Sequence, residues 1–290
     1  MIRRLLVVFV AIVTALAAGI AVGGGPLSDI GRTPSQAAPQ PQEPQVDLAA
    51  QARAAYADAF SVSAAPSLYA GRLHNHPVAL LTLPGADPEV VEALQAEVGS
   101  AGTQVVATYA LKRSLVDASD KSLVDTLGLQ LLDQLGADVV TADATTYDRI
   151  GQLVGKAVAA RKRSAAMEPA KVASLRASLH GAGMMAAVEG DPGVAPMVLL
   201  VTGSDVEQTV LSGLVSGLAA VARGVVVAGP TGDASIAALR AEPPLRAATT
   251  VDGTDTPAGR AAAVLALIGA VTAPGGAYGA SGADGPLPLG

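Results

Sequence analysis

An uncharged apolar run at residues 5–25 constrains this chain more than any other feature. The run follows Arg3 and Arg4, and the first acidic residue after it is Asp29. About 20 apolar residues in a helix cross a bilayer core of roughly 30 Å. Basic flanks stay on the cytoplasmic side, so the two arginines direct the rest of the chain out of the cytoplasm. We therefore expect a single N-terminal transmembrane helix, residues 1–25, that anchors an extracytoplasmic body to a membrane.

A cleaved signal peptide is the alternative interpretation of the same run. Small-x-small sites occur at Ala15-Leu16-Ala17, inside the run, and at Ser35-Gln36-Ala37, about ten residues past its end. Signal peptides have apolar cores of 7–15 residues, shorter than this one. The anchor is favoured, and both interpretations place the body in the cell envelope. Hydropathy leaves open whether the membrane is the inner or the outer one.

Composition then excludes several classes of function. The net charge is −6, and the densest basic cluster is only Arg161-Lys162-Arg163, so a nucleic-acid partner is not expected. No cysteine is present, which excludes disulfides, thiolate metal sites and a lipid anchor. Half of the residues are hydrophobic but only 2% are aromatic, and such a core of small aliphatic side chains favours helices packed on a buried sheet.

The chain divides by composition into four segments. After the anchor, residues 26–66 form a Pro/Gln-rich linker and a short alanine-rich helix at 47–60. Residues 67–272 carry the patterned body. Residues 273–290 are rich in glycine and proline, and we expect them to form a loose tail.

Apolar runs alternate with helical patterns along the body. The Asp87-Pro88-Glu89 sequence offers an N-cap, a proline at the first helical position and an acid in the first turn. The alternation predicts an α/β fold with a mostly parallel sheet covered on both faces. It allows two Rossmann-like halves, about 70–145 and 165–272, in one sheet or in two. Strands are expected at 78–83, 104–111, 184–188, 197–203, 224–229 and 247–253, and helices at 88–102, 112–136, 146–163, 167–183, 206–222, 234–242 and 256–271.

No motif points to an enzyme or to a bound cofactor. The turn at residues 229–233 joins a strand to a helix but lacks a Walker lysine and a GxGxxG run. Residues 181–186 fit GxGxxA, yet there a helix precedes the glycines and an apolar segment follows, the reverse of a dinucleotide site. No GxSxG elbow is present. We expect neither enzymatic activity nor a cofactor.

Four residues are weak candidates for contacts to a metal ion. His74 and His76 have the spacing that puts two imidazoles on one face of a strand, and imidazole suits Cu(II) and Zn(II). Met184 and Met185 carry sulfur soft enough for Cu(I), although neighbours on a strand point to opposite faces. A solvent-facing turn for the histidines and a place in the core for the methionines are the alternatives. His180 stands alone near a helix C-terminus.

Several segments, in order along the chain, are similar to one family. Residues 15–29 (ALAAGIAVGGGPLSD), the VVVAGPTGDAS segment, Thr250-Val251-Asp252, Gly259-Arg260, VLAL at 264–267 and residues 275–279 (GGAYG) resemble the actinobacterial MctB family of copper transport outer membrane proteins. The resemblance covers nearly the whole chain. Where family members usually carry a charged coiled coil after the anchor, this chain has the Pro/Gln linker and a short helix.

The resemblance implies a membrane-anchored role in copper homeostasis, namely transport or efflux that limits intracellular copper, with copper as the transported ion. Because one helix cannot line a pore, a channel would require a homo-oligomer, for which Gly19 and Gly23 offer a small-xxx-small face. One alternative is a membrane-tethered envelope scaffold or binding module without transport activity, and a third hypothesis is an exported α/β enzyme whose residues match no known motif.

Overall fold

A computed structural model describes residues 47–203, 206–241 and 247–289. The chain divides into two units, residues 1–49 and 50–290, and the described part of the first is limited to residues 47–49. The predicted transmembrane helix and most of the linker lie outside the described residues. Within the described ranges, no helix is both long and apolar enough to cross a membrane.

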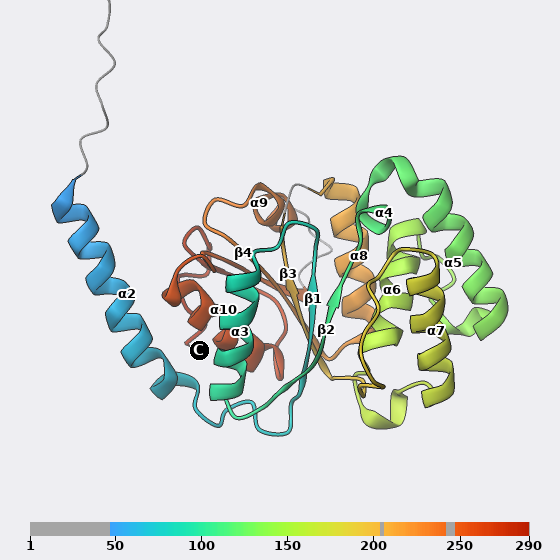
Figure 1. The fold of residues 1–290 in the computed structure, drawn as a ribbon, viewed down its shortest axis with the longest axis horizontal. Coiled ribbons are helices and arrows are strands. Elements are labelled where there is room, and N and C mark those ends of the chain that lie inside the picture. The colour runs from blue at the N-terminus through green and yellow to red at the C-terminus, as the bar shows by residue number, and fades with distance from the viewer. Residues whose placement is uncertain (1–46, 204–205, 242–246, 290) are drawn as a thin grey trace, which may run out of the picture. The chain divides into compact units, whose positions relative to one another are not determined.

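The second unit is built on one sheet of six strands, all parallel (Figure 1). The order across the sheet is β2-β1-β3-β4-β5-β6. The predicted parallel α/β fold is thereby confirmed, and the two expected halves contribute to a single sheet. The strands are β1 (Val78–Thr82), β2 (Val105–Ala110), β3 (Met197–Val201), β4 (Gly224–Gly229), β5 (Ala248–Asp252) and β6 (Ala277–Gly279).

The central strands are buried on both faces, which explains why they are continuous apolar runs. Side chains alternate along each strand, so Leu81 and Leu200 enter one core while Leu80 and Leu199 enter the other. Helices cover both faces, as parallel sheets require. The helices of the unit are α2 (Leu48–Tyr69), α3 (Pro88–Ser100), α4 (Arg113–Val116), α5 (Lys121–Leu135), α6 (Thr146–Val158), α7 (Pro169–Gly181), α8 (Gln208–Val221), α9 (Ala234–Arg240) and α10 (Pro257–Ala270).

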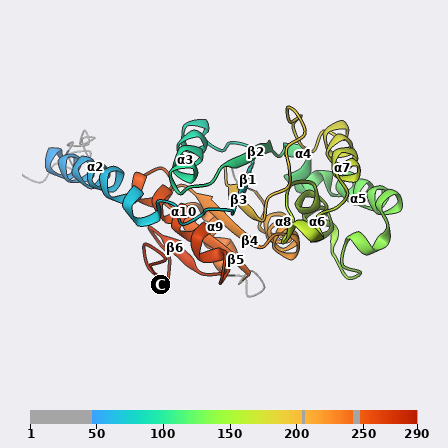
Figure 2. The ribbon, with the colours of Figure 1, turned by 90° about the horizontal axis from the view of Figure 1, so that it is seen from below.

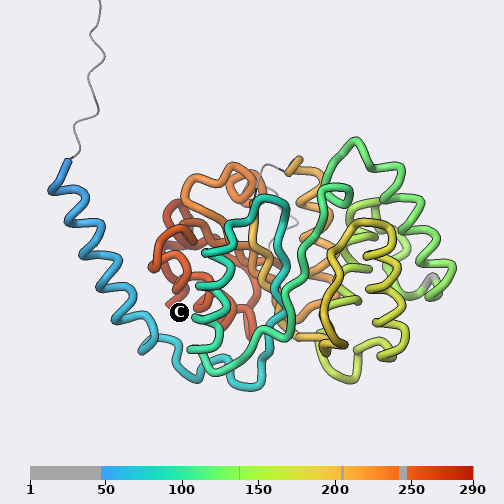
Figure 3. The backbone as a smooth tube through the Cα atoms, in the orientation of Figure 1, coloured from blue at the N-terminus to red at the C-terminus, as the bar shows by residue number. Residues whose placement is uncertain are grey.

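The helices α3 and α10 pack in one core, and α5 to α9 contribute to the other. Figures 1 and 2 show α5, α6 and α7 grouped away from α3 and α10. Helices α4 to α7 lie between β2 and β3 in the chain, and we call this segment the helical excursion. It can be followed along the green and yellow tube in Figure 3. The predicted N-cap of α3 is confirmed, because the Asp87 side chain accepts a hydrogen bond from the Glu89 amide and Pro88 begins the helix.

Glycines set the close packing of α6 on α8. A Cβ atom at Gly151 would collide with the backbone of Leu214, and one at Gly217 would collide with the backbone of Asp148 and Gln152. The two helices approach so closely because these positions carry no side chain. This contact holds α6, and with it the helical excursion, against α8, which packs on the sheet.

Three expectations about individual elements were wrong. The segment 184–188 is not a strand, because it forms only an isolated bridge, between Met185 and Leu111 just past β2, after a sharp turn at Gly183 with φ of 70°. The tail is not loose, because β6 lies within it and pairs with β5. The alanine-rich helix extends to Tyr69 rather than ending at residue 60, because its last turns bury Ala65 and Tyr69 in a core.

Candidate functional site

The two histidines predicted as metal contacts lie in the turn before β1, not on a strand. The intervening residue, Asn75, has φ of 63°, so the chain turns sharply between them. The amide of His74 donates to the Gly71 carbonyl at 3.3 Å, and the amide of His76 donates to the Leu73 carbonyl at 2.9 Å. The His74 side chain is exposed and that of His76 is partly buried. A shared strand face, the geometry expected from their spacing, is therefore absent.

The two methionines lie in the interior of the unit. Met184 and Met185 have exposed fractions of 0% and 1%, and both belong to the core that contains α6 and α8. His180 lies beside them, with its Nδ1 atom 3.3 Å from the Met185 carbonyl oxygen. In the part of the chain that the structure describes, no three His, Asp or Glu side chains are grouped as a metal site would need.

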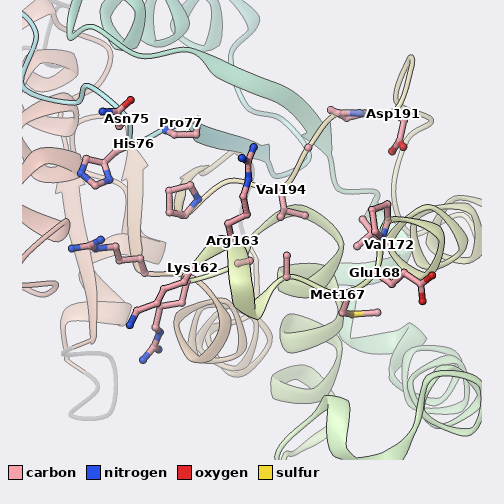
Figure 4. A pocket seen from close by; sticks show the side chains of 18 residues that line it. Asn75, His76, Pro77, Lys162, Arg163, Met167, Glu168, Val172, Asp191 and Val194 are labelled. Atoms are coloured by element: carbon pink, nitrogen blue, oxygen red, sulfur yellow. The ribbon is translucent and has the colours of Figure 1, made fainter.

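A cavity lies at the amino ends of the central strands. It has a volume of about 930 Å³. His76 precedes β1 and Arg223 precedes β4, while the segments before and after α7 supply the rest of the wall (Figure 4). The residues around it are Asn75, His76, Pro77, Ala160, Arg161, Lys162, Arg163, Ala166, Met167, Glu168, Pro169, Val172, Asp191, Pro192, Gly193, Val194, Pro196 and Arg223.

Four basic side chains border this cavity, those of Arg161, Lys162, Arg163 and Arg223. The Nη2 atom of Arg161 donates to the Ala219 and Ala220 carbonyls near the end of α8, at 3.3 and 3.4 Å. The Nε atom of Arg223 donates to the Val271 carbonyl just past α10, at 2.8 Å. Both arginines thus lie where helix carbonyl groups attract cations.

The His76 side chain at the border of the cavity has a lowered pKa. Partial burial lowers the pKa of the His76 imidazole below its ordinary value, and the nearby charge of Arg223 lowers it further. A neutral imidazole is the form that binds a metal ion. On the other wall, the acid Asp191 is paired with Arg176, whose Nη1 atom lies 3.2 Å from Oδ1 of Asp191.

The position of this cavity differs from the usual one in doubly wound sheets. Ligands of such folds bind outside the carboxyl ends of the strands, where the strand order reverses. Here that point lies between β1 and β3, and Gly203 packs so closely on the backbone of Pro84 and Ala86 that a Cβ atom would collide with it. A cavity of only about 220 Å³ lies nearby, beside Arg113 and Asp117.

Another polar cluster at the carboxyl edge has a structural role. Asp252, at the end of β5, pairs with Arg240 at 2.9 Å and accepts hydrogen bonds from the Ser281 amide and hydroxyl. Burial alone would raise the pKa of Asp252, but the hydrogen bonds from Ser281 and Arg240 and the charge of Arg240 outweigh burial and hold it below its ordinary value. This ionised carboxylate ties the segment after β6 to the sheet.

The strand order and the two-sided helical cover define the chain as a doubly wound parallel α/β protein. Residues 1–288 match the family model described as "Copper transport outer membrane protein, MctB". The chain therefore belongs to this family, which confirms the resemblance inferred from its motifs. No curated protein matches the chain.

Sequence reasoning missed most of the cavity. The cluster Arg161-Lys162-Arg163 is visible in the sequence, but Arg223, Glu168 and Asp191 belong to no local motif. These residues come together only because the segments around α7 fold back to the amino edge of the sheet. No pattern in the sequence predicts that His76 and residues 161–163 border the same cavity.

Proposed function

We infer that membership of this family gives the protein a role in copper transport or resistance. We propose that the protein is a membrane-anchored envelope protein that limits the copper content of the cell, acting in transport or efflux. The observation that carries the proposal is the family match over residues 1–288, which includes the apolar run as well as the α/β body. The family description names a transport protein, and we propose no enzymatic activity.

The proposed anchor is the apolar run at residues 5–25, joined to the body by the Pro/Gln-rich linker. Arg3 and Arg4 would remain cytoplasmic, leaving the body outside the cytoplasm. The family description names an outer membrane protein, and we propose that the body, exported through this anchor, lies in the cell envelope. Protease added to intact envelopes should then cleave the body but spare an epitope placed before Arg3.

Among the four candidate metal contacts, the geometry favours the histidines over the methionines. His74 is exposed and His76 borders a cavity, whereas Met184 and Met185 are enclosed in the core. We propose His74 and His76 as the first copper contacts to test. Titration of the purified full chain with Cu(II) should show binding that the double variant His74→Ala/His76→Ala loses and His180→Ala keeps. Equal binding by all three chains would remove these residues from the proposal.

Growth in copper tests the proposed function. A strain without the protein should stop growing at a lower copper concentration than its parent, and complementation with the full chain should restore growth. Tolerance to zinc serves as the control and should not change. Equal copper tolerance with and without the protein would contradict the proposal.

One observation favours the second candidate function, a tethered module that assembles with its partners in the envelope. Helix α2 leaves Tyr56, Phe60 and Val62 exposed by 75%, 63% and 61%, and solvent-exposed aromatic side chains are typical of interfaces. We propose a second copy of the chain as the partner of this helix. A photo-crosslinking residue at position 60 should yield a covalent dimer of the chain, whereas one at position 133, on α5, should not.

A further inference from the structure

The cavity at the amino edge of the sheet has the charge of an anion site. Four cationic side chains border it, Arg161, Lys162, Arg163 and Arg223, and none of them forms an ion pair with an acid of the described chain. The protein as a whole carries a net charge of −6. An acidic protein that gathers four uncompensated cations around one hollow creates a local potential of the opposite sign.

The two acids of the cavity do not cancel this charge. Asp191 is already paired with Arg176, which leaves Glu168 as the acid with no cationic partner in the described part of the chain. Figure 4 shows Lys162 and His76 on one side of the cavity and Glu168 and Asp191 on the other, so the charges are separated. A ligand with anionic groups would therefore lie on the side of Lys162 and His76, away from the acids.

Several donors around the cavity remain available. Lys162 and Arg163 make no side-chain hydrogen bond with the described residues, and Arg161 and Arg223 use one nitrogen each on helix carbonyls. Guanidinium groups present five N–H donors in a planar fork that matches phosphate and carboxylate oxygens. The volume of about 930 Å³ lies within the range of small-molecule sites, roughly 300–1,000 Å³.

We propose that this cavity binds a small molecule carrying two or more phosphate or carboxylate groups, held by Lys162, Arg163, Arg161 and Arg223. The ligand sits beside His76, at the edge of the sheet opposite to the one that doubly wound folds usually use. The proposal does not depend on copper, and its test is independent of the copper measurements.

A methionine probe makes the test local. The full chain has five methionines, of which Met167 borders the cavity while Met184 and Met185 are enclosed in the core. The full chain, labelled with ¹³C at the methionine methyl groups and held in phosphatidylcholine nanodiscs, is titrated with pyrophosphate and with citrate. Acetate at matched ionic strength is the control anion. We expect the Met167 signal to shift with a saturable dependence on the multivalent anions and not on acetate, while the signals of Met184 and Met185 stay in place.

The double variant Lys162→Gln/Arg163→Gln removes two donors that hold no other part of the fold. It should weaken pyrophosphate binding about tenfold or more. The matched control Arg53→Gln/Lys121→Gln removes the same charge from exposed positions outside the cavity and should bind as the unchanged chain does. Equal weakening in both variants would reduce the effect to net charge and overturn the proposed site.

Nanodiscs with added phosphatidylglycerol separate the two sources of a phosphate group. A Met167 shift with pyrophosphate in phosphatidylcholine alone supports a soluble ligand. A shift that requires phosphatidylglycerol, with none from soluble anions, would overturn the soluble ligand and assign the anion to a lipid headgroup. No Met167 shift in either arm would overturn the cavity as an anion site.

Discussion

Asp252 holds the C-terminal segment to the sheet through its carboxylate, which is 2% exposed and pairs with Arg240. Replacing Asp252 with Asn would leave the Arg240 guanidinium partly buried without its counter-charge. Removing one partner of such a pair costs about 3 kcal/mol. We expect Asp252→Asn to lower the free energy of unfolding by about that amount in denaturant titration, and Asp133→Asn, at an exposed position of α5, to change it little. Equal stability of the two variants would contradict this role.

The same carboxylate gives stability a defined pH dependence. Because the pKa of Asp252 is lower in the folded protein than its ordinary value of 3.8, the stabilisation is fully present above that value. It is lost as the pH falls through the folded pKa. The free energy of unfolding, measured by denaturant titration at about pH 5 and about pH 3, should therefore decrease more in the unchanged chain than in Asp252→Asn. Parallel curves would show that the carboxylate contributes no such stabilisation.

His76 offers a test of the electrostatics of the cavity. Burial and the charge of Arg223 lower its pKa below the ordinary value of 6.5. The folded protein then binds fewer protons here than the unfolded chain, so this group lowers the free energy of unfolding as the pH falls below 6.5. Titration of the imidazole by NMR should give a pKa below 6.5, and Arg223→Gln should raise it. The control Lys171→Gln, outside the cavity, should leave it unchanged, and a pKa at or above 6.5 in the unchanged chain would contradict this account.

Single residues also show where local patterns mislead. The spacing of His74 and His76 suggested a shared strand face, but the left-handed conformation of Asn75 turns the chain between them. Asparagine tolerates this conformation better than most residues, but an asparagine in the sequence does not by itself predict a left-handed turn. Leu73, just before the turn, is fully buried in the core that also holds Leu80 of β1.

Among the elements, the contact of α6 with α8 depends most on residue size. A methyl group at Gly217 would collide with the backbone of α6 at Asp148 and Gln152, and such overpacking costs about 1–3 kcal/mol. At Gly99, near the end of α3, a methyl group meets nothing within 4 Å. We expect Gly217→Ala to destabilise the protein by this amount and Gly99→Ala to be neutral or to stabilise it by up to about 1 kcal/mol. Thermal unfolding checks both, and a stable Gly217→Ala would show that α6 and α8 can separate without cost.

The sequence predicted the central elements well because each carries its own signal. Strands β1, β3 and β4 are apolar runs bounded by glycine or proline, and α3 begins at an N-cap followed by proline. The elements that were missed rely on partners distant in the chain. Strand β6 has three residues and exists because β5 and Asp252 lie beside it, so glycine and proline content alone indicated a loose tail.

At the scale of the molecule, alternation predicted the parallel sheet but could not give the order of its strands. The order depends on the excursion α4–α7, which returns the chain to β3 on the other side of β1. The cationic cavity follows from that return, because Lys162 and Glu168 lie on the returning segments and His76 lies before β1. No local pattern connects residues so far apart, which is why this cavity could not be predicted.

Copper content of the cell tests the central claim most directly. Cells with the protein, cells without it and complemented cells are loaded with the same copper concentration, and cell-associated copper is measured by mass spectrometry with zinc as the internal control. The account predicts higher copper without the protein, restored by the full chain, and unchanged zinc. Equal copper in all three strains would contradict a role in limiting copper and leave a tethered α/β module as the remaining candidate.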